Sequence, residues 1–231
     1  MRRIVCEANP GKTAPIRIAL LPGAYQNPEE FEHAGFVAAV RARDLAIDLE
    51  FIAIDFAHVL DRSGLAALRN EFVLPARRSG CRELWLGGAS LGAYIAMVYA
   101  DQQPGDVDGL CLFAPYLGSR IVTSEITEAG GVGAWKPRSI AADDEERRVW
   151  ALIRRLPSER VRVHLGVGGQ DRFGHGHRLF ADALPEGASD IVTGGHDWVT
   201  WLRLWELFLD RIAKPPAAHA PAAGPLLTSE P

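Results

Sequence analysis

The sequence predicts an α/β fold built on a mostly parallel central sheet with helices on both faces. Short apolar runs rich in branched residues alternate with helical patterns along almost the whole chain, which is the order that parallel strands and crossover helices need. The 231 residues fit one domain, because a chain of this length buries most of its surface in a single core. With 48% hydrophobic residues, the sequence can fill that core.

Six apolar runs are expected to form the strands. They lie at 16–21, 49–54, 83–87, 108–114, 161–167 and 189–193, and residues 2–7 can add a short edge strand. Helical patterns lie near 28–43, 64–79, 90–102, 143–155, 175–183 and 197–213. Ligands of parallel sheets bind beyond the carboxyl ends of the strands. The segments that follow the strands are therefore the place to search for a site.

Two segments depart from this alternation, and we expect the domain to span 1–213 around one of them. Residues 116–158 separate two strands by more than a simple crossover needs. This insert contains three closely spaced glycines, which would let it move as a lid. Its charged stretch is acidic at the start and basic at the end, as in a solvated helix that matches its own dipole. The Pro/Ala-rich tail, 214–231, has little to bury and is predicted to be disordered.

Composition excludes several classes of protein. With 25 Lys+Arg against 29 Asp+Glu, the formal net charge of −4 gives no reason to expect a nucleic-acid partner. No apolar run approaches the length of a membrane span, and no apolar stretch of a signal peptide follows the first arginines. Cys6, Cys81 and Cys111 are too far apart for a zinc site or a disulfide framework. Reduced thiols in a cytoplasmic protein fit this spacing.

A candidate nucleophile follows the predicted strand 83–87. The stretch Gly88-Ala89-Ser90-Leu91-Gly92 precedes a helical pattern. A serine on a tight strand-to-helix turn has a strained backbone that tolerates only small neighbours two residues away. That turn raises the hydroxyl above the sheet and places it at a helix N-terminus, which favours developing negative charge. The alternative is an ordinary glycine-rich turn, because the five-residue motif alone is weakly specific.

His196 is the candidate base, because it lies between the last strand and the last helix, in Gly194-Gly195-His196-Asp197-Trp198. His58 also follows a strand, nearer the N-terminus. The other histidines suit different positions: a satisfied core position for His164, and surface or tail positions for His33, His175, His177 and His219. The spacing of His175 and His177 has no supporting carboxylates or cysteines, so no metal site is expected.

Asp171 is the candidate acid that orients this base. It follows the strand 161–167 after two glycines that permit a sharp turn. Asp197, the neighbour of His196, is a poor alternative, because adjacent residues seldom let a carboxylate face the far nitrogen of the imidazole. Asp197 fits the first turn of the last helix better. The resulting chain order, Ser90, Asp171, His196, is that of one particular fold.

Over about residues 15–213 the chain resembles the α/β-hydrolase superfamily. The Gly-Gly-His-Asp-Trp stretch, followed by Trp201, is similar to the C-terminal block of the esterase D-like carboxylesterases. The resemblance implies an α/β-hydrolase fold, a catalytic triad of Ser90, Asp171 and His196, and no cofactor. Many members carry His-Gly after the first central strand, whereas this chain has Leu21-Pro22-Gly23-Ala24.

Backbone amides suffice for an oxyanion hole, so the missing histidine does not remove it. We expect the donors to be Leu91 N–H and Ala24 N–H, with Tyr25 as the alternative to Ala24. Tyr25, Tyr116 and Trp135 lie in loops or in the insert and are candidate walls of a substrate pocket. The aromatic residues at helical spacing after Asp197 are expected to be core.

The predicted function is therefore hydrolysis of a carboxylic ester or thioester through an acyl-enzyme, without cofactor or metal. An acyltransferase would use the same triad, with an alcohol or amine in place of water. A catalytically silent binding protein with this fold is the alternative outside enzymes.

Overall fold

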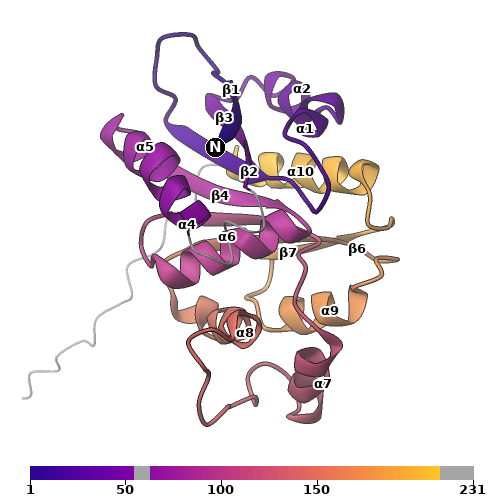
Figure 1. Ribbon diagram of the computed structural model, residues 1–231. Helices are drawn as coiled ribbons and strands as arrows, with labels where there is room; N and C mark the ends of the chain where they lie inside the picture. Colours follow the sequence, from indigo (N-terminus) through magenta and orange to yellow (C-terminus); the bar gives the residue numbers. More distant parts are fainter. Residues whose placement is uncertain (55–62, 214–231) are drawn as a thin grey trace, which may run out of the picture.

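A seven-stranded sheet runs through the centre of the computed structural model (Figure 1), which describes residues 1–54 and 63–213. The strand order is β1-β3-β2-β4-β5-β6-β7. Only β1 pairs antiparallel, and the other neighbours are parallel. The strands are β1 (Arg2–Cys6), β2 (Ile16–Leu21), β3 (Ile47–Ala53), β4 (Glu83–Ala89), β5 (Gly109–Phe113), β6 (Arg162–Gly168) and β7 (Ser189–Val192). The predicted fold class is confirmed, and residues 2–6 form the edge strand.

The helices follow the predicted order with two differences. They are α1 (Glu29–His33), α2 (Phe36–Arg41), α4 (Ser63–Leu68), the π-helical η1 (Arg69–Val73), α5 (Leu74–Arg78), α6 (Leu91–Gln102), α7 (Arg120–Glu128), α8 (Glu145–Arg155), the 3₁₀ turn η2 (Leu156–Ser158), α9 (Gly174–Asp182) and α10 (Trp198–Ile212). The helix predicted at 28–43 is split, because Gly35 adopts φ 98° between α1 and α2. The insert contains an additional helix, α7.

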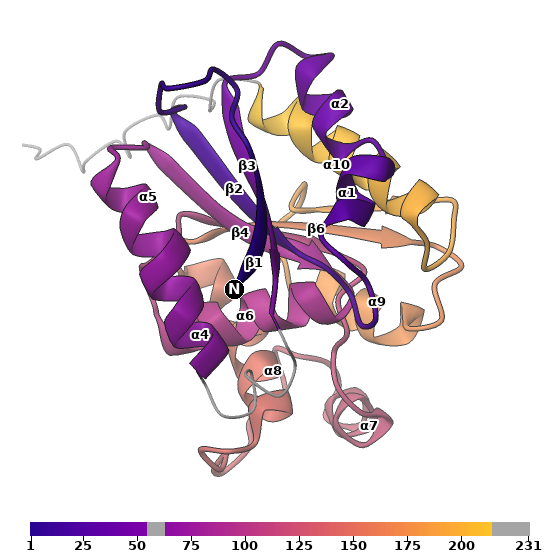
Figure 2. The ribbon, with the colours of Figure 1, turned by 45° about the horizontal axis from the view of Figure 1, so that its top comes forward.

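Helices cover both faces of the sheet (Figure 2). Along β2, Ile18 and Leu20 pack under α1, α2 and α10, whereas Ala19 and Leu21 pack against the helices of the opposite face. Both faces of this strand are therefore buried, which explains why its sequence is an unbroken apolar run and not an alternation of apolar and polar residues. The aromatic face of α10 is core, as predicted, with Trp205 fully buried.

The insert is fixed to the domain by ion pairs of α8. Arg148 and Arg155 both contact the carboxylate of Asp101 on α6, at 2.6 and 2.8 Å. Arg147 contacts Glu125 on α7 at 2.7 Å. The predicted pattern of an acidic first turn and a basic last turn is confirmed in α8. The ion pairs of these arginines with acidic residues of two neighbouring helices were not predicted. Movement of the insert as a lid stays a prediction.

Two predictions fall on residues that the structure does not describe: His58 and the tail 214–231 lie outside the described ranges. Within those ranges, every helix is too short or too polar to cross a bilayer.

Candidate active site

Ser90 stands between the end of β4 and the start of α6 with a strained backbone. Its φ and ψ are 52° and −114°, a combination that costs a non-glycine residue about 1–3 kcal/mol. The turn is held in place because Ser90 N–H donates to the Phe113 carbonyl at the end of β5, at 2.9 Å. The predicted strand–serine–helix turn is therefore present in the structure.

Gly88 and Gly92 are required because the turn lies directly on the end of β2. A Cβ atom on Gly88 would stand 2.2 Å from the Leu21 carbonyl oxygen, and one on Gly92 would stand 2.0 Å from the same atom. Both distances are far inside van der Waals contact, and the obstacle is backbone that cannot rotate away. The motif thus reflects the packing of the turn against the neighbouring strand.

The loops after β6 and β7 are hydrogen-bonded to each other. Gly169 N–H donates to the Val192 carbonyl at 2.7 Å, and Gln170 N–H donates to the Gly194 carbonyl at 2.9 Å. Because β6 and β7 are parallel neighbours, their carboxyl ends leave the sheet side by side. This pairing brings together two segments that the sequence separates.

The two loops join Asp171 to His196. Nδ1 of His196 lies 2.7 Å from Oδ2 of Asp171, whose side chain is fully buried. Phe173 N–H donates to the other carboxylate oxygen at 2.8 Å. Burial alone would raise the pKa of Asp171, but the hydrogen bonds from His196 and Phe173 together lower it below its ordinary value. A carboxylate at this position selects the imidazole tautomer with the proton on Nδ1, which leaves Nε2 free to accept a proton.

Asp197 has a different role, as the sequence predicted. Its Oδ1 accepts from Thr200 N–H at 2.9 Å, which caps α10. This backbone hydrogen bond lowers the pKa of Asp197.

A chain of contacts connects Ser90 with His196. Tyr116 N–H donates to the Ser90 carbonyl at 3.0 Å. The Tyr116 ring packs edge-on against Phe173 at 6.0 Å, and Phe173 packs edge-on against His196 at 5.2 Å. Trp201 contacts His196 at 5.1 Å between ring centroids. Among the described residues, the Ser90 hydroxyl makes no hydrogen bond, so its contact with His196 belongs to the proposal below.

Phe173 and Trp201 were missed as neighbours of the site. Trp201 was assigned to the core only, which is correct for its burial but omits its contact with the imidazole. The position of Phe173, two residues after Asp171, was the available signal.

His177 was wrongly expected on the surface, since it is 1% exposed. It lies on the same face of α9 as Phe180, three residues later, and this helical spacing was the signal that could have placed it. Its Nε2 lies 2.9 Å from the Pro115 carbonyl oxygen. Burial lowers the pKa of His177, so the ring is neutral and Nε2–H is the donor to this carbonyl. The bond fixes the segment that carries Tyr116.

The loop after β2 lies against Ser90. A Cβ atom on Gly23 would stand 3.3 Å from the Ser90 Cβ. Gly23 N–H is occupied by Gln26 Oε1 at 2.9 Å. No hydrogen bond within the described residues uses the N–H of Ala24 or Tyr25. Leu91 is the first residue of α6, where N–H groups have no acceptor inside the helix.

The three candidate pocket aromatics lie in different environments. Tyr25 is fully exposed with φ 62°. Tyr116 is half-buried, packs on Tyr94 at 5.6 Å, and its hydroxyl donates to Glu146 at 3.4 Å. Trp135 is 2% exposed and donates to Glu125 of α7 at 2.8 Å, so it is packed inside the insert.

Across residues 1–54 and 63–213, no three His, Cys, Asp or Glu side chains gather as metal ligands would. The groups that the structure gathers near Ser90 are a hydroxyl, an imidazole, a carboxylate and backbone amides.

Comparison with known proteins identifies a family. A family model described as "Putative esterase" matches residues 74–206, a stretch that contains Ser90, Asp171 and His196. No curated protein matches the sequence.

Solved structures share the fold at low identity. FphF, a fluorophosphonate-binding serine hydrolase of Staphylococcus aureus, is 11% identical, with a TM-score of 0.64 over 90% of this chain and 86% of its own. Est1E of Butyrivibrio proteoclasticus is 14% identical, with a TM-score of 0.60 over 92% and 94% of the two chains. S-formylglutathione hydrolase (FrmB) of Staphylococcus aureus is 10% identical, with a TM-score of 0.60 over 88% and 82%.

Proposed function

The chain belongs to the esterase family and is an ester-hydrolysing enzyme of the α/β-hydrolase fold, and we propose that Ser90, His196 and Asp171 form its catalytic triad. The observation that carries this proposal is the 2.7 Å hydrogen bond between His196 and the buried Asp171. Both residues, like the strained Ser90, follow the carboxyl ends of parallel strands. A nucleophile, a base and an orienting acid are the three groups that acyl transfer through serine requires.

In the acylation step, Ser90 Oγ attacks the acyl carbon, and the Oγ–H proton moves to His196 Nε2. Asp171 stabilises the imidazolium cation and keeps the proton on Nδ1. When the bond to the leaving group breaks, His196 returns its proton to the departing oxygen or sulfur. The product of this step is an acyl-Ser90 ester.

The negative oxygen of the tetrahedral intermediate needs donors that are already oriented. We assign them to Leu91 N–H, at the positive end of α6, and to Ala24 N–H, beside Ser90, with Tyr25 N–H as the alternative to Ala24. The occupied Gly23 N–H supports Ala24 or Tyr25 as the second donor. Loss of one such donor typically costs about 3–4 kcal/mol of transition-state stabilisation.

Deacylation repeats these steps with water as the nucleophile. His196 removes a proton from the water molecule, the hydroxide attacks the acyl carbon, and Ser90 leaves with that proton. The products are a carboxylic acid and the original enzyme.

The substrate class is a small carboxylic ester or thioester. We assign Tyr25, in the loop after β2, and Tyr116, whose N–H donates to the Ser90 carbonyl, to the wall beside the acyl group. The three thiols of Cys6, Cys81 and Cys111 are free, and we infer a cytoplasmic location from their spacing.

Hydrolysis of p-nitrophenyl acetate tests the triad. The unaltered protein should release p-nitrophenolate, and Ser90→Ala should lower kcat by at least about a thousandfold. Ser158→Ala, a change at an exposed serine whose hydroxyl bonds only Arg155 of its own turn, is the matched control. If Ser90→Ala retained more than a tenth of the parent rate, the assignment of the nucleophile would be wrong.

Addition of methanol or hydroxylamine, with acyl product measured against free acid, separates hydrolysis from acyl transfer.

A further inference from the structure

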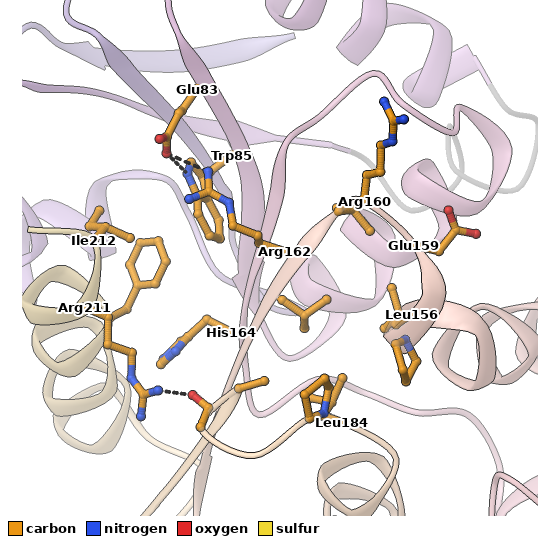
Figure 3. A pocket seen from close by; sticks show the side chains of 17 residues that line it. Glu83, Trp85, Leu156, Glu159, Arg160, Arg162, His164, Leu184, Arg211 and Ile212 are labelled. Carbon is orange, nitrogen blue, oxygen red and sulfur yellow. Dashed lines mark hydrogen bonds and ion pairs between the residues drawn. The ribbon is translucent and has the colours of Figure 1, made fainter. Parts of the chain in front are cut away.

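A cavity of about 480 Å³ lies at the amino-terminal ends of β4 and β6 (Figure 3), whereas Ser90 follows the carboxyl end of β4. Glu83 begins β4, Arg162 begins β6 and Ala188 directly precedes β7, and all three line the cavity. The candidate catalytic residues follow the carboxyl ends of strands instead. This cavity is therefore separate from the proposed acyl site, and its volume falls in the range of small-molecule sites.

The cavity lies beside the start of β6, where no described strand pairs with the side of β6 that faces β7 farther along. Pairing of β6 with β5 begins at Arg162, but pairing with β7 begins only at Leu165. Arg162 N–H donates toward β5, to Asp108, and Leu165 N–H donates toward β7, to Ala188. Backbone groups of a strand alternate between its two sides, so the N–H and C=O of Val163 face the same side as those of Leu165. The N–H and C=O of Val163 therefore point away from β5, toward the side where no described strand pairs with this part of β6.

The walls of the cavity form a slot. On one side, the rings of Trp85 and His164 each contact Phe208, at centroid distances of 5.0 and 5.2 Å. Leu156 and Leu184 line the other side, as Figure 3 shows. Side chains of β6 alternate between the sheet faces, so this strand contributes to both walls. A flat apolar body fits between an aromatic wall and an aliphatic one.

Arg160 gives the rim an unpaired positive charge. Within residues 1–54 and 63–213 it has no acidic partner, although it lines the cavity. The other charges around the cavity neutralise one another in ion pairs: Arg162–Glu83, Arg211–Asp190 and Arg155–Glu159. One guanidinium is therefore unpaired. Its exposed side chain extends away from the slot in Figure 3, so it has to turn toward the cavity to meet a ligand carboxylate.

His164 adds a polar group inside the slot. It lies on β6 as predicted, but the prediction that its ring is satisfied was wrong. The residue is 3% exposed, its Nε2 is 3.7 Å from Asp190 Oδ2, and its ring makes no hydrogen bond within the described residues. Burial lowers the pKa of His164 to about 4, so the ring is neutral at pH 7. With the Nε2 proton facing Asp190, Nδ1 is left as an acceptor for a donor group.

We propose that this cavity binds a planar aromatic monocarboxylate that carries a hydroxyl group, independently of the catalytic triad. The exposed Arg160 side chain turns toward the cavity and contacts the ligand carboxylate, the ring lies in the slot between Phe208 and Leu184, and the hydroxyl donates to His164 Nδ1.

A fluorescence titration with 6-hydroxy-2-naphthoate tests the proposal on the full chain. We expect saturable binding of one molecule per chain. Arg160→Met should weaken binding at least tenfold and leave the hydrolysis of p-nitrophenyl acetate unchanged. Arg203→Met removes an exposed arginine of α10 that does not line the cavity, and it should leave binding unchanged.

Two further measurements make the proposal falsifiable. Saturating probe should not inhibit p-nitrophenyl acetate hydrolysis competitively, because the cavity and the acyl site are separate. His164→Phe should remove the preference for the hydroxylated probe over 2-naphthoate, and Arg160→Met decides the matter if that variant fails to fold. Absence of saturable binding, competitive inhibition, or equal losses in Arg160→Met and Arg203→Met would overturn the proposal. None of these outcomes depends on Ser90 being the nucleophile.

Discussion

The imidazole of His196 is hydrogen-bonded to Asp171, 25 positions away in sequence, and not to its neighbour Asp197. The His196 Nδ1–Asp171 Oδ2 distance is 2.7 Å, whereas the Asp197 carboxylate turns to the first turn of α10. The hydrogen bonds between the loops after β6 and β7 set this choice.

Replacement of each aspartate separates their roles. We expect Asp171→Asn to lower kcat by roughly 10³–10⁴-fold, because the amide favours the wrong imidazole tautomer. Asp197→Asn should change kcat little, since asparagine caps a helix as well as aspartate does. Steady-state kinetics on an ester measures both. Similar losses of kcat in the two variants would contradict the assignment of the acid.

Gly92→Ala should destabilise the protein by about 3 kcal/mol or more. The added methyl group would stand 2.0 Å from the Leu21 carbonyl oxygen, which belongs to the central sheet. Gly133→Ala is the matched control, because nothing lies within 4 Å of its added Cβ. Urea unfolding compares the two. Equal stabilities would mean that the turn is not packed on β2.

His177→Phe should cost about 1–3 kcal/mol of stability, because it leaves the Pro115 carbonyl without its donor. We also expect kcat to fall, because this bond fixes the segment that carries Tyr116 beside Ser90. His175→Phe changes an exposed residue of the same helix and should spare kcat. An unaltered kcat in a folded His177→Phe variant would leave His177 with a structural role only.

His164 predicts an acid-dependent loss of stability. Its folded-state pKa, about 4, lies below the ordinary value of 6.5, so the unfolded chain binds the proton more readily. The free energy of unfolding should therefore fall as the pH drops from 6.5 to about 4, by about 3 kcal/mol in total. His164→Gln should remove this part of the pH dependence. Unfolding titrations at several pH values measure the difference, and parallel pH profiles of the two proteins would contradict it.

Local patterns were enough to predict which segments of the chain form strands and which form helices. Unbroken apolar runs indicate strands that are buried on both faces. The glycines around Ser90 indicate a turn packed so closely on β2 that it leaves no room for a Cβ atom at those positions. The pairing of Asp171 with His196 could be proposed because consecutive parallel strands end at the same edge.

Contacts between distant segments could not be predicted in this way. The aromatic neighbours of His196 are Phe173, in the loop before α9, and Trp201, in α10, and their packing depends on how these two helices meet the sheet. The ion pairs of Asp101 with Arg148 and Arg155 depend on how α8 of the insert packs against α6. The open side of β6 arises because the first residue of β7, Ser189, pairs with Leu165 and not with Arg162, a register that the sequence does not display.

Labelling with a fluorophosphonate, followed by mass spectrometry of the intact protein and its peptides, tests the nucleophile most directly. We expect one adduct per chain, located on Ser90 and absent from Ser90→Ala. Labelling that persists in Ser90→Ala, or an adduct on another residue of the unaltered protein, would contradict the triad.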